Sequence, residues 1–363
     1  MIGKRKTGQG SVRSAIGTMI GRKYEQCERC CMDSTATEFV KTPTGCYFCD
    51  LARKNKPDYK AIWDFKLHPE RLKTNHPKYD ALLGISGGVD SSYCLHLLHS
   101  MGIRVLAYSI DNGYNDPKAD ENMMRLVEGM KVPFYRYTID LKKFAHLQNA
   151  FIKAGVKNIE IPTDHILMAS AYELANQYGI KTIISGGNWA TESIMPESWG
   201  YQPRDLKHIK AIYRRFTGKV LSGLPLCGLA KFNFYRWVRR IRVVNLLDYF
   251  TYNREEAIKL LEEKYGWQAY GEKHGENYFT RWFQNFYLYE KFGIDKRKAY
   301  LSSLIVSGQL SREQAVELLS ESPIYPQLGI EEKVLKYPKH EYNEYPTDEK
   351  LFNFIGKIVK FLR

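Results

Sequence analysis

The 363-residue sequence has no run of about 18 apolar residues, the length that a membrane-spanning helix requires. Its basic first 26 residues also lack the apolar stretch of a secretory signal. Internal repeats and low-complexity tracts are missing as well. A hydrophobic fraction of 44% is ample for a folded core, which excludes a disordered chain. We therefore expect a globular, cytoplasmic protein without a transmembrane segment.

Cysteine is scarce, and four of the seven cysteines form two Cys-x2-Cys pairs, Cys27 with Cys30 and Cys46 with Cys49. In a chain without a secretory signal, such pairs favour a metal site over disulfides. Fifteen residues separate the pairs, a spacing at which four thiolates can surround Zn²⁺ tetrahedrally. No histidine lies between them, which favours a structural site. Cys31 is an alternative ligand, and an iron–sulfur cluster is an alternative occupant.

The cysteines outside this module do not indicate a reactive thiol. Cys94 is in register with Leu97 and Leu98 on a predicted helix, so we expect it to be packed in the core. Cys227 stands alone in GLPLCGLA, and a structural role is more typical of such a residue than catalysis. Chemistry that needs a pair of thiols in the core is therefore not favoured.

Acidic residues are nearly missing from Tyr201–Arg242, which holds eleven Lys and Arg residues and one Asp, in a chain of net charge +14. Such a block attracts anions, which can be nucleic acid, nucleotide-sugars, an anionic membrane or an acidic partner protein. A solvated helix face is the plainer alternative. Within this region Lys231–Asn245 mixes aromatic residues and arginines, as interfacial helices do.

The order of predicted elements indicates an α/β protein with a doubly wound parallel sheet. Short apolar runs at 81–85, 104–110, 133–139 and 181–185 predict strands, and helices are expected at 118–130 and from a cap at Thr163 and Asp164 to Tyr178. Beyond residue 200 the pattern is mostly helical, with helices expected near 207–215, 253–265, 278–290 and 311–320, the last with a capping box of Ser311 and Gln314. We divide the chain into a zinc-ribbon-like module at 1–75, a catalytic domain at 76–200, a helical basic region at 201–330 and a tail at 331–363.

One glycine-rich loop lies between the first of these strands and the next helix. It consists of Ser86, Gly87, Gly88, Val89, Asp90, Ser91 and Ser92. Glycines let successive backbone N–H groups turn toward phosphate oxygens, and the helix N-terminus adds its dipole. Asp90 fits a Mg²⁺ ligand, since a carboxylate would repel a phosphate directly. The GxxxxGK[ST] motif of kinases and GTPases is absent.

This loop resembles the SGGxDSS motif of the ATP pyrophosphatase (PP-loop) superfamily. The resemblance implies a nucleotide-binding fold of the HUP-like type, in which ATP is cleaved between its α and β phosphates. It also implies that the turn after the second strand, with Asp111 and Gly113, contacts the adenosine.

Three later stretches, Ile161–His165, Ser185–Ser193 and Tyr270–Asn277, resemble the N-acetyl sugar amidotransferases of bacterial surface-polysaccharide biosynthesis, such as those of the O-antigen. The resemblance implies an ATP-dependent ligase that adenylates the acetamido oxygen of an N-acetylated nucleotide-sugar, after which ammonia forms an acetamidino group. We expect Lys273 to stabilise the leaving pyrophosphate and His274 to move a proton. Asn188, Thr191 and Glu192 follow a strand, where they can contact substrate or Mg²⁺. For these positions a structural hydrogen bond is the alternative.

Further expectations follow from the basic block and from the resemblance. Arg214 and Arg215 are expected to reach the substrate diphosphate, and Arg236–Arg242 to face a partner or a membrane surface. Since the sequence shows no glutaminase motif, a separate class I glutaminase would supply ammonia through a channel. The main alternative is a PP-loop tRNA-modifying enzyme, a thiolase or lysidine-type synthetase, which the basic charge also suits. Another is a membrane-surface scaffold with a degenerate nucleotide site.

Overall fold

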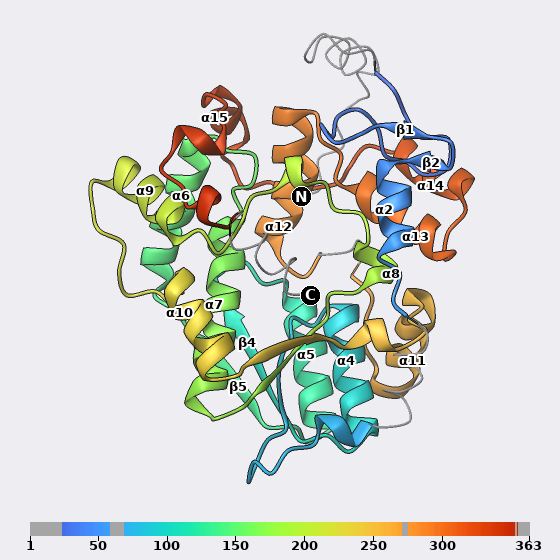
Figure 1. Ribbon diagram of the computed structural model, residues 1–363, viewed down its shortest axis with the longest axis vertical. Helices are drawn as coiled ribbons and strands as arrows, with labels where there is room; N and C mark the ends of the chain where they lie inside the picture. Colours follow the sequence, from blue (N-terminus) through green and yellow to red (C-terminus); the bar gives the residue numbers. More distant parts are fainter. Residues whose placement is uncertain (1–23, 59–68, 271–274, 353, 355–363) are drawn as a thin grey trace.

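Five parallel strands form the central sheet of the computed structural model, which describes residues 24–58, 69–270, 275–352 and 354 (Figure 1). The strands are β3 (Ala81–Gly84), β4 (Val105–Asp111), β5 (Phe134–Thr138), β6 (Thr182–Ser185) and β7 (Arg242–Asn245). They lie in the order β5-β4-β3-β6-β7. Because the chain runs outward from β3 to one edge and then returns to the other, the sheet is doubly wound, as the sequence predicts.

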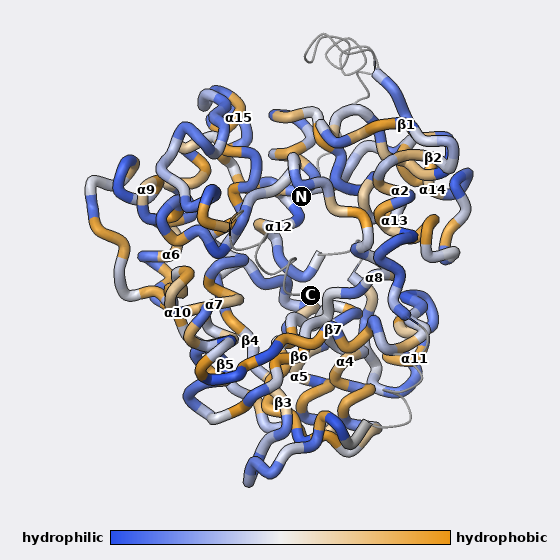
Figure 2. Tube along the Cα trace, in the orientation of Figure 1, coloured by the Kyte–Doolittle hydropathy of each residue, from blue (hydrophilic) through white to orange (hydrophobic). Residues whose placement is uncertain are grey.

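Both faces of the sheet are buried, which explains why its central strands are apolar rather than alternating. Leu82, Leu106 and Ile183 are neighbours in register and pack into the core on one face. Leu83 and Ala107 belong to the core on the opposite face. Figure 2 shows apolar residues gathered around β3, β6 and α4 at the base of the molecule.

Helices cover the two faces in two groups. The first core includes buried side chains of α6 (Leu141–Ala154), α7 (Ile161–Gln177) and α9 (Leu206–Thr217). The second includes those of α4 (Val89–Ser100), α5 (Pro117–Gly129) and α11 (Arg254–Tyr265). None of the helices in the described part of the chain is long and apolar enough to cross a membrane.

Local capping explains where several of these helices begin. The Asp116 and Asp140 carboxylates accept the Lys118 and Lys143 backbone N–H groups at the starts of α5 and α6. The predicted capping box of Ser311 and Gln314 is present at α14. The predicted cap at Thr163 and Asp164 is wrong: α7 begins earlier, at Ile161, with Pro162 in its first turn, a position that suits proline's fixed backbone.

The region after residue 200 is less purely helical than predicted. Lys231–Asn245 does not form one interfacial helix: α10 (Leu229–Asn233) and the π-helical η3 (Phe234–Val238) lead into β7, which pairs with β6. The sheet therefore extends past the expected boundary at residue 200. Before residue 200, β6 is followed by α8 (Trp189–Glu192) and η2 (Glu197–Trp199). The other elements after residue 200 are η4 (Leu246–Tyr249), α12 (Tyr278–Trp282), the π-helical η5 (Phe283–Lys291), α13 (Arg297–Ser307), α14 (Arg312–Ser320), α15 (Glu331–Lys336) and η6 (Tyr342–Glu344).

The N-terminal module and the C-terminal tail pack on opposite sides of the molecule (Figure 1). The module consists of β1 (Lys41–Thr42), β2 (Gly45–Cys46) and α2 (Tyr47–Lys54), followed after a gap by η1 (Pro69–Leu72). Helix α2 contacts α13, which in turn packs against α8. The tail closes on the end of α6, where the Tyr345 hydroxyl donates to the Ala154 carbonyl at 3.2 Å.

Candidate active site

The glycine-rich loop leaves β3 and turns directly into α4. Gly87 has a φ of +79°, and a Cβ placed there would lie 1.9 Å from the Ala119 carbonyl oxygen of α5. Only glycine combines this left-handed conformation with such a close approach of a neighbouring backbone. Gly88 then serves as the N-cap of α4. The tight turn is thus set by how closely α5 packs against the loop.

Hydroxyl groups hold the loop in shape. The Ser86 backbone N–H donates to the Ser91 Oγ at 3.3 Å, and the Ser91 hydroxyl donates to the Gly88 carbonyl at 3.1 Å. The Gly88 N–H donates to Ser86 Oγ at 3.3 Å. The loop opens at the N-terminus of the 12-residue α4, where free N–H groups and the helix dipole favour an anion. Ser92 is buried behind it and does not line the pocket.

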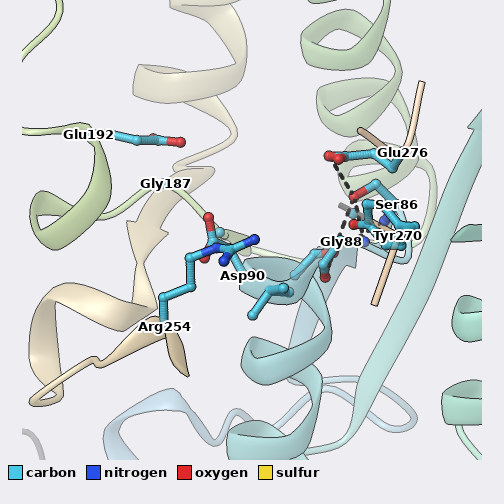
Figure 3. Close-up of a pocket in the computed structure, with 12 residues that line it drawn as sticks. Ser86, Gly88, Asp90, Gly187, Glu192, Arg254, Tyr270 and Glu276 are labelled. Atoms are coloured by element: carbon cyan, nitrogen blue, oxygen red, sulfur yellow. Dashed lines mark hydrogen bonds between the residues drawn. The ribbon is translucent and has the colours of Figure 1, made fainter. Parts of the chain in front are cut away.

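A pocket lies over this loop and is walled by three parts of the chain (Figure 3). Its lining residues are Gly84, Ser86, Gly88, Val89, Asp90, Ser91, Gly186, Gly187, Glu192, Arg254, Tyr270 and Glu276. The loop forms the floor, the turn after β6 and Arg254 line one side, and Tyr270 and Glu276 line the other. Figure 3 shows Glu276 beside Ser86, with Glu192 and Arg254 on the other side of the pocket.

Carboxylates dominate the polar lining of the pocket. Asp90, Glu192 and Glu276 face it, and Arg254 is the one cation among the lining residues in the described part of the chain. Asp90 accepts a hydrogen bond from the Tyr252 hydroxyl, and the Ser86 hydroxyl donates to Glu276 Oε1 at 3.4 Å. Burial, reinforced by the nearby Glu276 carboxylate, raises the pKa of Tyr270, so this phenol stays protonated and can donate.

The carboxylates among the described lining residues suit a divalent cation beside an anionic ligand. Three carboxylates against one arginine would repel a polyanion, whereas carboxylate oxygens are the ligands that Mg²⁺ prefers. Asp90 and Glu192 are the residues that would hold Mg²⁺. The ion would neutralise charge on the phosphates as pyrophosphate leaves.

The turns at the strand ends place the other predicted residues. Asp111 Oδ1 accepts the Gly113 backbone N–H at 2.8 Å, and Gly113 has a φ of +83°, which makes the predicted turn. Asn188 Oδ1 accepts the Thr191 N–H at 2.9 Å and its hydroxyl at 3.1 Å, so these two residues cap α8. Of the three residues predicted after β6, Glu192 lines the pocket and the other two support the helix that carries it.

Two family models match the chain. Residues 80–256 match the family described as Queuosine biosynthesis protein QueC, and residues 276–347 match LPS biosynthesis protein WbpG-like, C-terminal domain. The first match spans all five strands and the glycine-rich loop. The second begins at Glu276, in the wall of the pocket. The chain thus carries a QueC-like domain of the PP-loop family and a WbpG-like C-terminal domain.

No curated protein matches the sequence. Among solved structures, NMN synthetase from Francisella tularensis is 15% identical over 51% of this chain and 97% of its own, with a TM-score of 0.30. NH3-dependent NAD synthetase from Campylobacter jejuni is 15% identical over 60% and 84%, with a TM-score of 0.28. A predicted tRNA methyltransferase subunit from Methanocaldococcus jannaschii is 16% identical over 50% and 73%, with a TM-score of 0.29. TM-scores this low give no basis for a conclusion about substrate.

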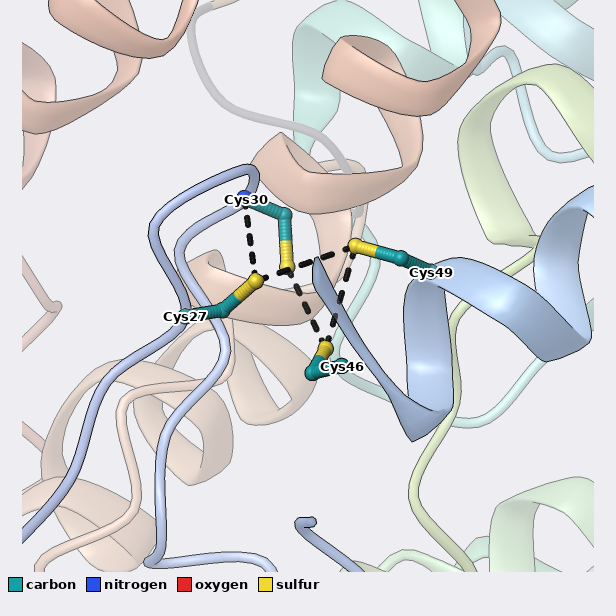
Figure 4. Close-up of side chains that lie close together, drawn as sticks. All are labelled: Cys27, Cys30, Cys46 and Cys49. Carbon is teal, nitrogen blue, oxygen red and sulfur yellow. Dashed lines mark hydrogen bonds between the residues drawn. The ribbon is translucent and has the colours of Figure 1, made fainter. Parts of the chain in front are cut away.

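The four predicted cysteines of this PP-loop protein meet at one buried point (Figure 4). The Sγ atoms of Cys27 and Cys49 are 3.9 Å apart, those of Cys30 and Cys46 3.8 Å, and those of Cys46 and Cys49 3.7 Å. Four thiolates bound tetrahedrally at about 2.3 Å from Zn²⁺ would have sulfur atoms about 3.8 Å apart. The cluster therefore fits a structural zinc ion.

Cys31 is not part of this cluster. Its side chain packs with Leu301, Leu304 and Ala315, and its backbone N–H donates to the Ser302 hydroxyl at 3.0 Å. The alternative in which Cys31 replaces a ligand is therefore wrong. Cys94 and Cys227 are buried as expected, and burial raises the pKa of both thiols, that of Cys227 to about 11.

The zinc module is fastened to the part of the PP-loop domain that carries Glu192. The Trp189 indole N–H of α8 donates to the Ala52 carbonyl at 2.8 Å, and the Ser198 backbone N–H donates to Glu38 Oε1 at 2.7 Å. Arg312 of α14 donates to the Cys27 carbonyl at 3.3 Å. The four-cysteine module thus supports the segment that carries Glu192.

Several predicted site residues in the described part of the chain do not line this pocket: Gly87, Ser92, Asp111, Gly113, Asn188, Thr191, Arg214 and Arg215. Lys273 and His274 lie outside the described residues. Arg214 and Arg215 lie near the end of α9, which packs against α6, and they do not line the pocket. Their contact with a substrate diphosphate stays a prediction.

The pocket also contains residues that sequence reasoning missed. Arg254 lines the pocket and Tyr252 donates to Asp90 from beside it, and neither residue belongs to a recognisable motif. Tyr270 and Glu276 also line the pocket and lie in the stretch Tyr270–Asn277. Three hydrogen bonds tie Trp267, Gln268 and Asn277 to the loop and to the elements beside it. The Trp267 indole donates to the Gly87 carbonyl at 3.0 Å, Asn122 Nδ2 donates to the Gln268 carbonyl at 2.7 Å, and Asn277 Nδ2 donates to Asn112 Oδ1 at 3.1 Å.

Proposed function

We propose that this PP-loop protein is an ATP-dependent amidotransferase that converts the acetamido group of an N-acetylated nucleotide-sugar into an acetamidino group. The supporting observation is the shared pocket. The ATP-binding loop supplies its floor, and the WbpG-like domain, whose family is named for lipopolysaccharide biosynthesis, supplies Glu276 in its wall. The WbpG-like domain, proposed to determine which substrate binds, would thus meet the ATP-binding domain at the pocket where the substrate is activated.

The chemistry explains why ATP is needed. An amide carbonyl is a poor electrophile because the nitrogen lone pair is delocalised into it, and its oxygen is also a poor leaving group. In the proposed reaction the acetamido oxygen attacks the α-phosphorus of ATP, the bond to the β-phosphate breaks, and pyrophosphate departs. Ammonia then adds to the activated carbon, AMP leaves with the former carbonyl oxygen, and a proton is lost to give the acetamidino group.

Different residues of the pocket have different roles in this reaction. The N-terminus of α4, at the end of the glycine-rich loop, binds the pyrophosphate portion, where preorganised donors and the helix dipole stabilise the charge that develops on it. Arg254 adds positive charge from the opposite wall. Glu276 lies close enough to the loop to accept the proton that the attacking ammonia loses. Asp90 and Glu192 would hold Mg²⁺.

Ammonia is proposed to come from a separate class I glutaminase. The sequence has no glutaminase motif. The five-stranded sheet with its helices belongs to the PP-loop domain. The purified chain should therefore use free ammonium but not glutamine. Hydrolysis of glutamine by the chain alone would show that a second active site has been overlooked.

The test combines the chain with ATP, ammonium and a panel of N-acetylated UDP-sugars. We expect release of AMP and pyrophosphate and the mass decrease that follows when an imino group replaces a carbonyl oxygen. Glu192→Gln and Glu276→Gln should each lower the rate at least tenfold, whereas Glu121→Gln on the outer surface of α5 should not. Pyrophosphate release that depends on no sugar would contradict the proposed substrate.

A tRNA-modifying activity is the second candidate, because residues 80–256 match a family named for queuosine biosynthesis and the chain is strongly basic. Sulfur transfer is the less favoured form of it: outside the four-cysteine cluster all three remaining cysteines are buried, and burial raises the pKa of each thiol. Transcribed tRNA should be tested in the same assay as an alternative substrate. ATP turnover that requires tRNA and ignores every sugar would favour this candidate.

A further inference from the structure

One long segment of the chain carries positive charge without any acidic residue. From Leu206 to Leu247 there are ten Lys and Arg residues and no Asp or Glu. This segment forms α9, α10, η3 and β7. Figure 1 shows α9 and α10 on the same side of the molecule, away from the zinc module. Two of these cations pair with acidic residues elsewhere in the chain, Lys207 with Asp348 and Lys231 with Glu173. Exposed arginines on the remainder of the segment attract anions or stay solvated.

The turn between α10 and β7 adds exposed apolar side chains to this charge. All five residues from Arg236 to Arg240 are exposed, Trp237 by 68% and Val238 by 66% of their surfaces. Phe234 is exposed by 43%. We call Phe234, Arg236–Arg240 and Arg242 the arginine–tryptophan patch. Apolar side chains this exposed beside several arginines are typical of an interaction site.

The patch is held firmly by the side chains beneath it. Tyr235 is buried and stacks on Tyr172 of α7, with ring centroids 5.7 Å apart. Phe232 is also buried and meets Tyr172 edge-on at 5.2 Å. With Phe232 and Tyr235 directed inward, the π-helical turn of η3 leaves Trp237 and Val238 directed outward. The apolar tip is therefore a fixed feature of the fold.

The position of the patch excludes the reactants as its occupants. Strand β7 runs parallel to β6, and η3 precedes β7, so the patch lies at the amino end of these strands. The pocket lies at the opposite end, where Gly186 and Gly187 follow β6. A nucleotide-sugar, or a subunit that delivers ammonia, has to reach the pocket. A ligand of the patch would leave the pocket open.

We propose that the arginine–tryptophan patch binds the surface of an anionic phospholipid bilayer. Tryptophan favours the level of the headgroups because its ring is apolar and its N–H is polar, and valine gains by leaving water. Arginines close to the surface are attracted by anionic headgroups. The phosphates of a nucleic acid would bind the arginines, but they would make no apolar contact with Val238. The inference does not depend on which substrate the pocket binds.

Vesicle flotation with the full chain tests this proposal. Wild-type protein should float with vesicles that contain about 30% phosphatidylglycerol in phosphatidylcholine and should stay behind with pure phosphatidylcholine. The charge variant Arg239→Glu/Arg240→Glu and the apolar variant Trp237→Ser/Val238→Ser should each lower the bound fraction at least tenfold. Lys259→Glu/Lys264→Glu on α11 changes the charge equally at another exposed site and should bind like wild type. Thermal melting confirms that each variant is folded.

Two readouts separate insertion from simple charge attraction. Lipids brominated on their acyl chains should quench part of the tryptophan fluorescence of the wild type, and Trp237→Phe should remove that part while it keeps vesicle binding. Equal binding by the apolar variant and the wild type would overturn the proposal. So would tight, salt-sensitive binding of tRNA that the charge variant loses while no vesicle is bound, because that result assigns the patch to nucleic acid.

Discussion

Gly87 offers the sharpest test of how the ATP-binding loop is built. Its backbone is left-handed, with a φ of +79°, and its missing Cβ leaves room for the Ala119 carbonyl oxygen, which would lie 1.9 Å from that atom. Replacing Gly87 by alanine therefore imposes two costs, one from the backbone conformation and one from the collision. The chain contains glycines at which these costs can be measured separately.

Gly102 has a φ of +66°, and nothing lies within 4 Å of the position that a Cβ would take. Gly102→Ala should thus cost only the left-handed conformation, about 1–2 kcal/mol. Gly87→Ala should add an overpacking cost of about 1–3 kcal/mol, because a backbone carbonyl cannot rotate away as a side chain can. Gly88 has no left-handed φ, and its Cβ would meet mainly side-chain atoms of Glu276, Tyr270 and Ser86 at 3.1–3.2 Å.

Thermal melting and ATP binding by calorimetry measure the two effects. We expect Gly102→Ala to lower the melting temperature slightly and to bind ATP normally. Gly88→Ala should keep the fold but weaken ATP binding, since it fills the floor of the pocket. Gly87→Ala should lower the melting temperature more than Gly102→Ala and lose ATP binding. If Gly87→Ala is as stable as Gly102→Ala and binds ATP, the close approach of α5 is not what requires glycine here.

The remaining predictions concern the metal ions and one buried histidine. Asp90→Asn should abolish pyrophosphate release while the melting temperature changes little, because the carboxylate is needed for Mg²⁺ and not for the core; normal turnover would remove Asp90 from the mechanism. Elemental analysis should find one Zn²⁺ per chain, and Cys49→Ser should lose it and also slow turnover, since the module supports α8; iron with visible absorption would refute the zinc assignment. Burial lowers the pKa of His208 to about 4, so the unfolded chain, with a His pKa of about 6.5, takes up this proton first. Stability should therefore fall by about 3 kcal/mol between about pH 6.5 and pH 4, and His208→Phe should reduce this loss in acid unfolding followed by circular dichroism.

The sequence predicts the structure correctly where a local pattern of residues is compatible with one local structure. The run of glycine and serine from Ser86 to Ser92 after an apolar strand predicts the loop, and the spacing of Cys27, Cys30, Cys46 and Cys49 predicts their cluster. The parallel sheet follows from alternating strands and helices. In each case the residues that matter are close in sequence, or their type limits what they can bind.

It fails where the contact is long-range and the residue type is common. Strand β7 was missed because Arg242–Asn245 is short, has exposed side chains and follows an aromatic, basic stretch. Arg254 reaches the pocket because α11 packs against α4 and α5. No periodicity in the sequence predicts this packing. Thr163 and Asp164 suggested a cap, yet Pro162 sets the start of α7 one turn earlier.

The way the pocket is assembled makes its chemistry depend on both halves of the chain. The loop alone presents N–H groups and one carboxylate, a set that suits any ATP pyrophosphatase. Trp267, Gln268 and Asn277 fasten the second half to the loop through hydrogen bonds to Gly87, Asn122 and Asn112. Asn277→Ala should therefore lower turnover more than it lowers ATP affinity, because it frees the wall that carries Glu276 and leaves the floor intact. An equal loss of both would mean that the wall also holds the nucleotide.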